Sequence, residues 1–312
     1  MRLISVLFIT ALLCACASRV TVKSPGQTPA VKPLSELQNV PGLGTPRRLE
    51  PGVLFYAVTL PREQATNKLW VYLPESPQEE KLSCVFVAPA GSNLFTGMAL
   101  GEGDRPEHLP YVRAGFAVVA YELDGPLSRD HTPSNEEVIN AFKSFQRAEA
   151  GVANARMAID YALAKVPRVD AERIYVAGHS SAATLSLLVA ERDPRVKACV
   201  AYAPVTDIET HLGPHTVKVL SNVQGFRDFI KDNSPLTHAA QLSCPLFLFS
   251  ADDDSVVPPE QSARFAEAVR GVNPAVTYVR VPSGDHYDSM IHEGVPRAIR
   301  WLKELRPAGQ KH

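Results

Sequence analysis

The segment IYVAGHSSAATLSLLVAER constrains the fold of this 312-residue chain more than any other. Residues 174–177 are short, apolar and partly β-branched, as in a buried strand, and residues 182–192 are rich in Ala and Leu, as in a helix. Such a sharp turn brings strand and helix almost into contact, which requires small residues at Gly178 and Ala182. Ser180, at the apex of the turn, is then expected to stand clear of the sheet.

The run Gly-His-Ser-Ser-Ala matches the G-x-S-x-G nucleophile elbow, with Ala182 in place of the second glycine. On such an elbow the serine hydroxyl is a nucleophile, and we interpret Ser180 in this way. The alternative is that Ser180 only caps the following helix. A strand before the serine and a helix after it are the context that the catalytic motif requires, so they favour the nucleophile.

The composition indicates an ordinary globular protein with one domain or at most two. The chain is 45% hydrophobic and has a formal net charge of -1, which gives no electrostatic reason to expect nucleic acid. The sequence contains no G-x-x-x-x-G-K phosphate loop and no Cys/His spacing typical of zinc sites, so we expect neither cofactor nor metal. No feature indicates a protein partner.

The first 16 residues resemble a bacterial lipoprotein signal peptide. One basic residue precedes an apolar run, residues 3–13, that is too short to span a membrane. The following LCAC ends at Cys16, which the resemblance implies is the cleavage and lipidation site. Because Ala17 is not acidic, the resemblance implies an outer-membrane anchor facing the periplasm, with the lipid as the only membrane attachment. The alternative is a plain signal peptide cleaved near Ala17.

Residues 17–45 are rich in Pro, Gly, Ser and Thr without a period, and we expect a flexible spacer before a domain at residues 46–308. Three cysteines, Cys84, Cys199 and Cys244, fall in or beside apolar runs of this domain. Their odd number and scattered positions favour buried hydrophobic residues over a disulfide framework, although an exported protein permits one bridge.

Eight runs in the domain are typical of strands: residues 53–60, 68–74, 84–91, 114–123, 173–178, 197–204, 244–250 and 276–282. The first two predict a hairpin. A long helix is expected over residues 136–164 and a last one over about 294–305. The alternation of strands and helices predicts an α/β fold, a mostly parallel sheet with helices on both faces.

This layout resembles the α/β-hydrolase fold over about residues 53–305. YVRAGFAVVAYELDG resembles its fourth-strand region, and VDAERIYVAGHSSA resembles its elbow. FSADDDSVVPPEQSARF and VPSGDHYDSM resemble the C-terminal half of prolyl oligopeptidase-type catalytic domains and of dienelactone hydrolase-like esterases. The resemblance implies a three-layer fold with an eight-stranded sheet, and a nucleophile, an acid and a histidine in that chain order.

The acid is expected among Asp252, Asp253 and Asp254, which follow the seventh strand-like run. The family places an Asp three residues before a Val-Pro pair, and this spacing selects Asp254. Asp207, after the sixth run, is the alternative, because some members of the family carry the acid there.

The base is expected to be His286, in the glycine-containing loop after the eighth run. It follows Asp254 by 32 residues, which leaves room for one helix and one strand between two loops. His179, beside Ser180, is expected to pack at the flank of the elbow rather than to act as the base. The other histidines after Ser180 are less suited to the role: His211, His215, His238, His292 and His312.

His211 and His215 have a spacing that a helix could use to bind a metal. Gly213-Pro214 lies between them, however, so a regular helix and a metal site are not expected there. His238 lies on a short helix-like run and is expected to be packed or solvated, and His312 is terminal.

Attack by the serine would place a negative charge on the carbonyl oxygen of the substrate, the oxyanion. The backbone N–H of Ser181, at the positive end of the elbow helix, is expected to donate a hydrogen bond to it. The second donor should come from the loop APAGSN after the third run. Gly91 and Ser92 are both candidates, and the sequence leaves the choice between them open.

The resemblance implies attack on an acyl carbon and an acyl-enzyme, with a small-molecule ester or short peptide as substrate. Residues 204–234 are expected to form a small cap. Only about 30 spacer residues precede the domain, and Ser181 replaces the usual aromatic residue, so an esterase is favoured over a prolyl oligopeptidase-type peptidase. A third possibility is an inactive binding protein, since Ala182 and Ala251 depart from the family pattern. The complete order of Ser180, acid and histidine argues against it.

Overall fold

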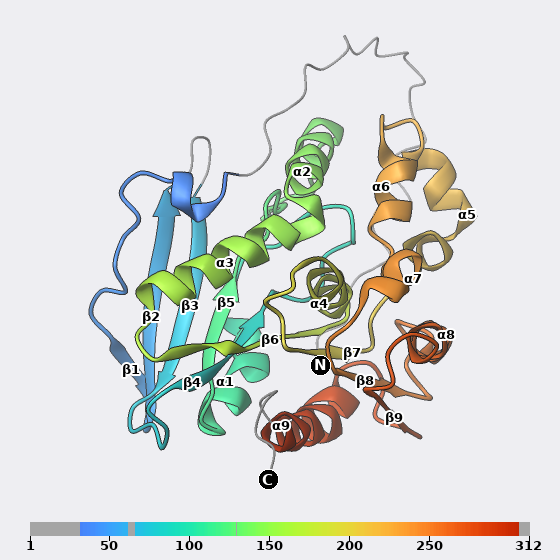
Figure 1. The fold of residues 1–312 in the computed structure, drawn as a ribbon. Coiled ribbons are helices and arrows are strands. Elements are labelled where there is room, and N and C mark those ends of the chain that lie inside the picture. Colours follow the sequence, from blue (N-terminus) through green and yellow to red (C-terminus); the bar gives the residue numbers. More distant parts are fainter. Residues whose placement is uncertain (1–31, 62–65, 129, 306–312) are drawn as a thin grey trace.

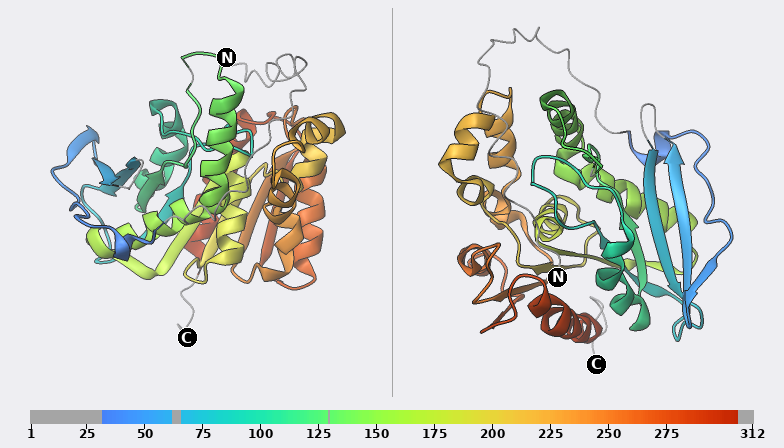
Figure 2. Two further views of the ribbon diagram at one scale, coloured as in Figure 1. Left: turned by 90° about the horizontal axis from the view of Figure 1, so that it is seen from above. Right: turned by 180° about the vertical axis from the view of Figure 1, so that it is seen from behind.

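The computed structural model describes residues 32–61, 66–128 and 130–305, and in these residues the strands form one nine-stranded sheet (Figure 1). Helices cover both faces of the sheet, which gives three layers (Figure 2). This confirms the predicted fold class. The strands are β1 (Arg47–Glu50), β2 (Val53–Pro61), β3 (Thr66–Pro74), β4 (Leu82–Val87), β5 (Ala117–Tyr121), β6 (Val169–His179), β7 (Ala198–Tyr202), β8 (Leu246–Ala251) and β9 (Val276–Val281).

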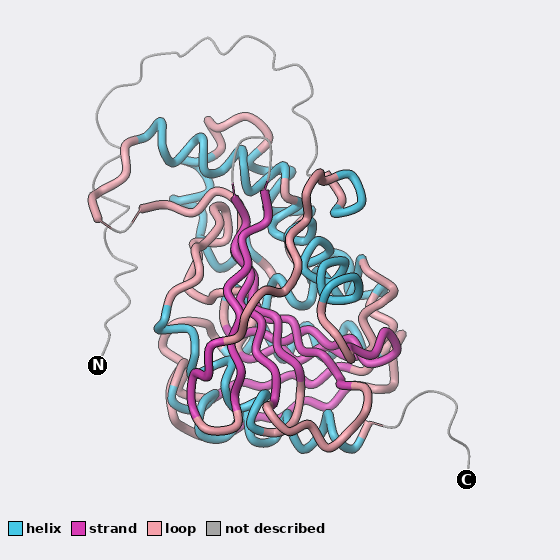
Figure 3. The backbone as a smooth tube through the Cα atoms, turned by 90° about the vertical axis from the view of Figure 1, so that its left-hand side faces the viewer, coloured by secondary structure: helices cyan, strands magenta, loops and turns pink. Residues whose placement is uncertain are grey.

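The strands lie in the order β1-β2-β3-β5-β4-β6-β7-β8-β9. Neighbours from β5 to β9 are parallel, whereas β1, β2 and β3 join the sheet antiparallel. The predicted hairpin is β2 and β3, and the strands twist across the sheet (Figure 3). Because the carboxyl ends of parallel strands share one edge, the loops after β4, β6, β8 and β9 come together there.

The sheet has one strand more than the eight predicted, because Arg47–Glu50 forms β1 at its edge. No strand was expected in this segment, since RRLE shows no apolar alternation. An edge strand pairs with a single neighbour and does not need an apolar face. Its charged side chains form ion pairs instead: Glu50 accepts two hydrogen bonds from Arg113, at 2.7 and 2.8 Å, and Arg48 binds Glu75.

Two hydrophobic cores lie on the two faces of the sheet. α3, α4 and α8 pack on one face, and α1 and α9 pack on the other. β5 and β7 are buried along their whole length, as their continuously apolar sequences predict. The helices are α1 (Arg105–Arg113), α2 (Asn135–Arg147), α3 (Val152–Lys165), α4 (Ser181–Arg192), α5 (Ile208–Leu220), α6 (Phe226–Asp232), α7 (Pro235–His238), α8 (Pro259–Arg270) and α9 (Val295–Glu304). In the described part of the chain, no helix combines the length and the hydropathy needed to span a membrane.

The single helix expected over residues 136–164 is two helices, α2 and α3. Between them Glu149, Ala150 and Gly151 all have positive φ angles, of 53°, 56° and 94°. The break has a packing reason, because a Cβ on Gly151 would lie 3.0 Å from side-chain carbons of both Leu123 and Leu185. The backbone of Gly151 therefore approaches the core more closely than a continuous helix with a side chain would allow.

Part of the predicted spacer packs against the domain. Leu34 is the first residue of a short 3-10 helix, Leu34–Glu36. Its side chain is only 6% exposed and belongs to the hydrophobic core on the α3 side of the sheet. Leu37, Val40 and Leu43 continue this contact at three-residue spacing. The predicted flexibility therefore does not apply to this stretch. The predicted signal peptide, with Cys16, lies outside the described residues.

The segment predicted as a cap contains α5 and α6. Phe226 and Phe229 of α6 contact the ring of Phe142 in α2, with centroids 5.8 and 5.1 Å apart. Phe226 also contacts Phe95, which follows β4. Aromatic packing therefore holds this segment against α2 and the loop after β4.

The three cysteines of the domain, Cys84, Cys199 and Cys244, are buried and have free thiols. Burial raises the pKa of each thiol, so the uncharged form is favoured. They behave as the small buried hydrophobic residues that were expected.

Candidate active site

Ser180 lies at the turn between β6 and α4, where the sequence predicted it. Its φ of 56° and ψ of -123° are strained for a residue with a side chain. The backbone N–H of Ser180 donates to the Tyr202 carbonyl at 2.9 Å, which helps to hold this conformation. A Cβ on Gly178 would lie 2.3 Å from the Ala182 carbonyl oxygen, so only glycine fits two residues before the apex.

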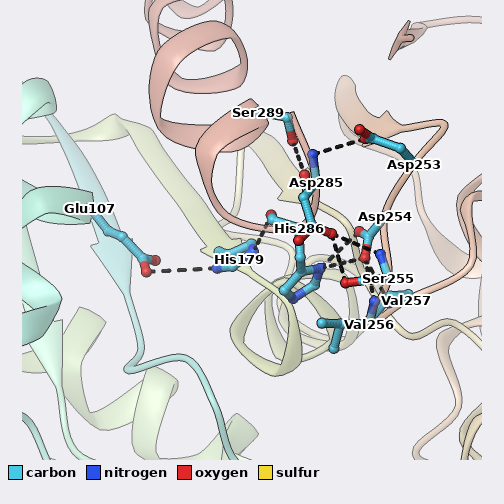
Figure 4. Close-up of polar contacts among 10 residues, drawn as sticks. All are labelled: Glu107, His179, Asp253, Asp254, Ser255, Val256, Val257, Asp285, His286 and Ser289. Carbon is cyan, nitrogen blue, oxygen red and sulfur yellow. Dashed lines mark hydrogen bonds and ion pairs between the residues drawn. The ribbon is translucent and has the colours of Figure 1, made fainter. Parts of the chain in front are cut away.

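His286 and Asp254 are brought together from the loops after β9 and β8 (Figure 4). His286 Nδ1 lies 2.8 Å from Asp254 Oδ2 and 3.0 Å from Oδ1, and the two side chains are 4% and 1% exposed. Asp254 Oδ1 also accepts the backbone N–H groups of Val256 and Val257, at 2.9 and 2.8 Å. A carboxylate can only accept hydrogen bonds, so a neutral His286 paired with it in this way carries its proton on Nδ1 and presents Nε2 as an acceptor.

The three consecutive aspartates have three different partners. Asp252 binds Arg280 on the exposed face of β9. Asp253 accepts the backbone N–H groups of Gly284 and Asp285, at 3.1 and 2.8 Å. Only the third, Asp254, contacts His286, as the family spacing implied.

The acid loop and the histidine loop are held together from both sides (Figure 4). Asp253 of the first loop binds the N–H groups of the second, and Asp285 of the second accepts both the N–H and the hydroxyl of Ser255, each at 2.8 Å. The hydrogen bonds from Ser255 lower the pKa of Asp285 below its usual range. We call this pair of interactions the Asp253–Asp285 clasp. It fixes the relative position of Asp254 and His286.

Asp207, the alternative acid, has other partners. Its carboxylate accepts the N–H and the hydroxyl of Thr210, at 3.1 and 2.7 Å, at the start of α5. Arg264 lies 3.7 Å from its Oδ2. In the described residues Asp254, and not Asp207, is the acid hydrogen-bonded to His286.

His179 packs directly against His286, a contact that the sequence did not reveal. The two ring centroids are 4.4 Å apart, and His179 Nε2 donates to the His286 carbonyl at 3.0 Å. Glu107 of α1 lies 3.7 Å from the other nitrogen of His179 and is also mostly buried. Glu107 is distant in the sequence from every candidate residue, so no local pattern could have identified it.

In the described residues none of the other histidines is hydrogen-bonded to the side chain of His286 or Asp254. His211 is partly buried on α5, and burial is the main cause that lowers its pKa, with a smaller effect from the nearby His286. Gly213 has φ 76° and ψ 161° and breaks α5, as expected, so His211 and His215 do not share a regular helix. His238 is half-buried, with Nε2 2.9 Å from the Asp232 carbonyl oxygen. Among the described residues no group of three or more His, Cys, Asp and Glu side chains could hold a metal ion.

The candidate oxyanion donors lie beside the elbow. The backbone N–H groups of Gly91 and Ser92 both donate to the side-chain oxygen of Ser181, each at 3.0 Å. Ser181 is the first residue of α4, so its own N–H belongs to the unpaired donors at the helix start. The residues named from the sequence therefore lie together, because the Ser181 hydroxyl accepts both N–H groups of the loop after β4.

A small crevice runs from Ser92 and Ser181 along α4. It has a volume of about 10 Å³, about the space of a single water molecule. Its other walls are mainly apolar and include Leu94, Leu123, Phe145, Leu185, Leu188 and Ile208. A larger cleft of about 530 Å³ lies at the opposite end of α4, around Arg192, and does not include the candidate site.

Comparisons with known proteins give a consistent result. The prolyl oligopeptidase family matches residues 143–305 of this chain. Acetyl esterase Axe7A of Xylanibacter ruminicola is 31% identical over 119 residues, which are 34% of this chain and 26% of that protein. The match thus spans about a quarter of the length of that curated relative.

Two solved structures resemble the fold over most of the chain. An acetyl xylan esterase from Paenibacillus sp. R4 has a TM-score of 0.61 and 16% identity, covering 84% of this chain and 88% of its own. An acylaminoacyl peptidase of Pyrococcus horikoshii has a TM-score of 0.62 and 15% identity, covering 84% of this chain and 43% of its own. At these sequence identities the likeness demonstrates a shared fold. An esterase and a peptidase both share it with this chain.

Proposed function

This chain belongs to the prolyl oligopeptidase family, which consists of serine hydrolases with the α/β-hydrolase fold, and we propose that it cleaves carboxylic esters through an acyl-enzyme. Ser180 is the nucleophile, His286 the general base and Asp254 the acid that orients it. The observation that carries this proposal is the buried hydrogen bond of 2.8 Å between His286 Nδ1 and Asp254, in loops that follow the elbow in the chain order of the fold.

In the proposed reaction, Ser180 Oγ forms a bond to the acyl carbon while its proton moves to His286 Nε2. The carbonyl π electrons move onto oxygen and form the oxyanion. Collapse of this intermediate expels the alkoxide, which takes the proton from Nε2, and leaves the acyl group on Ser180. Water then attacks the acyl carbon and gives its proton to His286 Nε2. Collapse of this second intermediate returns the proton to Ser180 Oγ and releases the carboxylic acid product. Asp254 stabilises the imidazolium at both stages, and its burial keeps the interaction from being screened by solvent.

Several observations support an ester rather than a peptide as substrate. The crevice beside Ser181 holds about one water-sized group and is walled mainly by apolar side chains, which suits the methyl of a small acyl group better than a bulky side chain. An alkoxide leaves with less assistance from His286 than an amine does, so an ester places weaker demands on the site. The similar acetyl esterase and acetyl xylan esterase agree with this choice.

A peptidase is the second candidate, because the family and the similar acylaminoacyl peptidase favour it. A binding protein without activity is the third candidate, because Ala182 and Ala251 differ from the residues that the family pattern has at these positions. The two hydrolase candidates differ in their expected preference. We expect small acyl esters to be cleaved with a kcat/KM at least about tenfold above matched aminoacyl anilides, equivalent to roughly 1.4 kcal/mol in transition-state binding.

The test combines labelling and a substrate panel. A fluorophosphonate probe should label the protein, and Ser180→Ala should abolish both labelling and hydrolysis of p-nitrophenyl esters. Ser186→Ala is the matched control, since Ser186 is buried on the same helix and, among the described residues, its hydroxyl donates to the Ala182 carbonyl alone. Absence of labelling in the wild-type protein would favour the binding protein. Anilides cleaved as well as esters would favour the peptidase.

The location proposed for this enzyme is the outer membrane, facing the periplasm, where Cys16 would carry the lipid anchor. The support is the sequence alone: a basic residue, the apolar run of residues 3–13, and the LCAC motif that ends at Cys16.

A further inference from the structure

We infer that the side-chain hydroxyl of Ser181, rather than the N–H group of Gly91 or Ser92, donates the second hydrogen bond to the oxyanion. This inference rests on the proposed function, because it assigns a donor to the intermediate formed on Ser180. The first donor remains the backbone N–H of Ser181. One residue would then supply two different hydrogen bonds to the same charge.

The geometry begins with the loop after β4. Gly91 has φ 96°, a conformation that glycine adopts readily, and the N–H groups of Gly91 and Ser92 converge on one atom. Two successive N–H groups directed at one point form a site that suits a negative charge. Here the atom at that point is Ser181 Oγ, 3.0 Å from each nitrogen.

The hydroxyl of Ser181 can then make one more hydrogen bond, as a donor. A serine oxygen has two lone pairs and one proton, and the two N–H groups occupy both lone pairs. The proton must therefore point away from the Gly91–Ser92 loop. In the described residues no acceptor is found for it, although Ser181 is only 8% exposed. An acceptor that forms next to Ser180 would satisfy this donor.

The two backbone donors also make the hydroxyl a better donor. Each N–H draws electron density from Oγ, so the O–H bond becomes more polar and its hydrogen bond stronger. Direct binding of the oxyanion by Gly91 or Ser92 would instead require Ser181 Oγ to leave both of them. Separating these partners would cost about 1–3 kcal/mol for a buried group that found no replacement. Donation through Ser181 needs no such rearrangement, which is the property of an efficient oxyanion site.

The experiment compares variants of Ser181 on p-nitrophenyl acetate and on a boronic acid that forms a tetrahedral adduct with Ser180. Ser181→Ala should lower kcat by about 10²–10³-fold with little change in KM, as expected for the loss of one oxyanion donor. Its affinity for the boronic acid should fall by a comparable factor, because the adduct resembles the intermediate. Ser181→Thr keeps the hydroxyl and should stay within about tenfold of wild type. Ser186→Ala should match wild type.

Ser181→Cys provides a second route if Ser181→Ala does not fold, since a thiol is a weaker donor of similar shape, and it should lower kcat by more than about tenfold. Activity of Ser181→Ala equal to or above wild type would overturn the inference, because Gly91 and Ser92 would then bind the oxyanion themselves. A loss of kcat without weaker boronic acid binding would also overturn it, as a structural effect. If wild-type protein is not labelled by fluorophosphonate, the proposed function and this inference both fail.

Discussion

Replacing Glu191 should stabilise the protein, by an amount that depends on pH. Glu191 lies in the last turn of α4, is 7% exposed, and neither carboxylate oxygen has a hydrogen-bond partner in the described residues. Burial raises the pKa of this carboxyl to about 9, and the neighbouring charge of Arg192 opposes the shift only in part. The folded protein therefore holds a proton on Glu191 at neutral pH, which the unfolded chain has lost.

The size of the effect follows from this difference in bound protons. Below the ordinary pKa of about 4.5 both states are protonated, and Glu191 adds no pH dependence. Between about pH 4.5 and 9 only the folded state keeps the proton, so the free energy of unfolding falls by up to about 1.4 kcal/mol per pH unit. At pH 7 the accumulated penalty is of the order of 3 kcal/mol. Glu191→Met has a similar size and no charge, and should remove the penalty.

The assay is urea unfolding followed by circular dichroism at several pH values from 5 to 8.5. The measured quantity is the difference in unfolding free energy between Glu191→Met and wild type, because other titrating groups cancel in this difference. It should be small at pH 5 and grow towards pH 8.5. Glu267→Met, on the exposed side of α8, is the control and should show no such trend. A difference that stays constant across this range would refute the reasoning, since it would mean that Glu191 is ionised in the folded protein.

Three further predictions follow from the candidate site and from the N-terminus. His286→Ala should lower kcat by about 10³-fold or more with the fold intact, and near-normal ester turnover by a well-folded variant would contradict its role as base. Asp254→Asn should lose far more activity than Asp253→Asn or Asp207→Asn, and a larger loss at Asp207 would move the acid to the loop after β7. Cys16→Ser should shift the protein from the membrane fraction to the soluble exported fraction while it keeps its activity on a soluble ester, whereas wild-type protein found wholly soluble would exclude the anchor.

The elbow and the pairing of Asp254 with His286 could be predicted because local constraints determine both. Gly178 is required because a side chain there would collide with the Ala182 carbonyl. These two residues are only four positions apart, so the requirement is visible in the sequence. Asp254 and His286 each follow a strand whose apolar run is easy to recognise, and parallel strands bring the loops after them to one edge.

Features that depend on contacts between distant segments were not predictable from the sequence. The break between α2 and α3 arises where Gly151 meets Leu123 and Leu185, and the sequence itself continues at helical spacing through it. Gly91 is likewise 90 residues from Ser181, and nothing in either segment indicates that they share a hydrogen bond. Such contacts depend on how the helices and loops pack, which a periodic pattern does not encode.

The edge strand β1 has a consequence for how the protein behaves at high concentration. A strand at the edge of a sheet presents unpaired N–H and C=O groups that can recruit a strand from another molecule. β1 is short, its register shifts between Arg48 and Glu50, and its charged side chains are held by Glu75 and Arg113. A second copy approaching this edge would meet charge and an irregular backbone. β1 therefore protects the sheet from growing by intermolecular strand pairing at this edge.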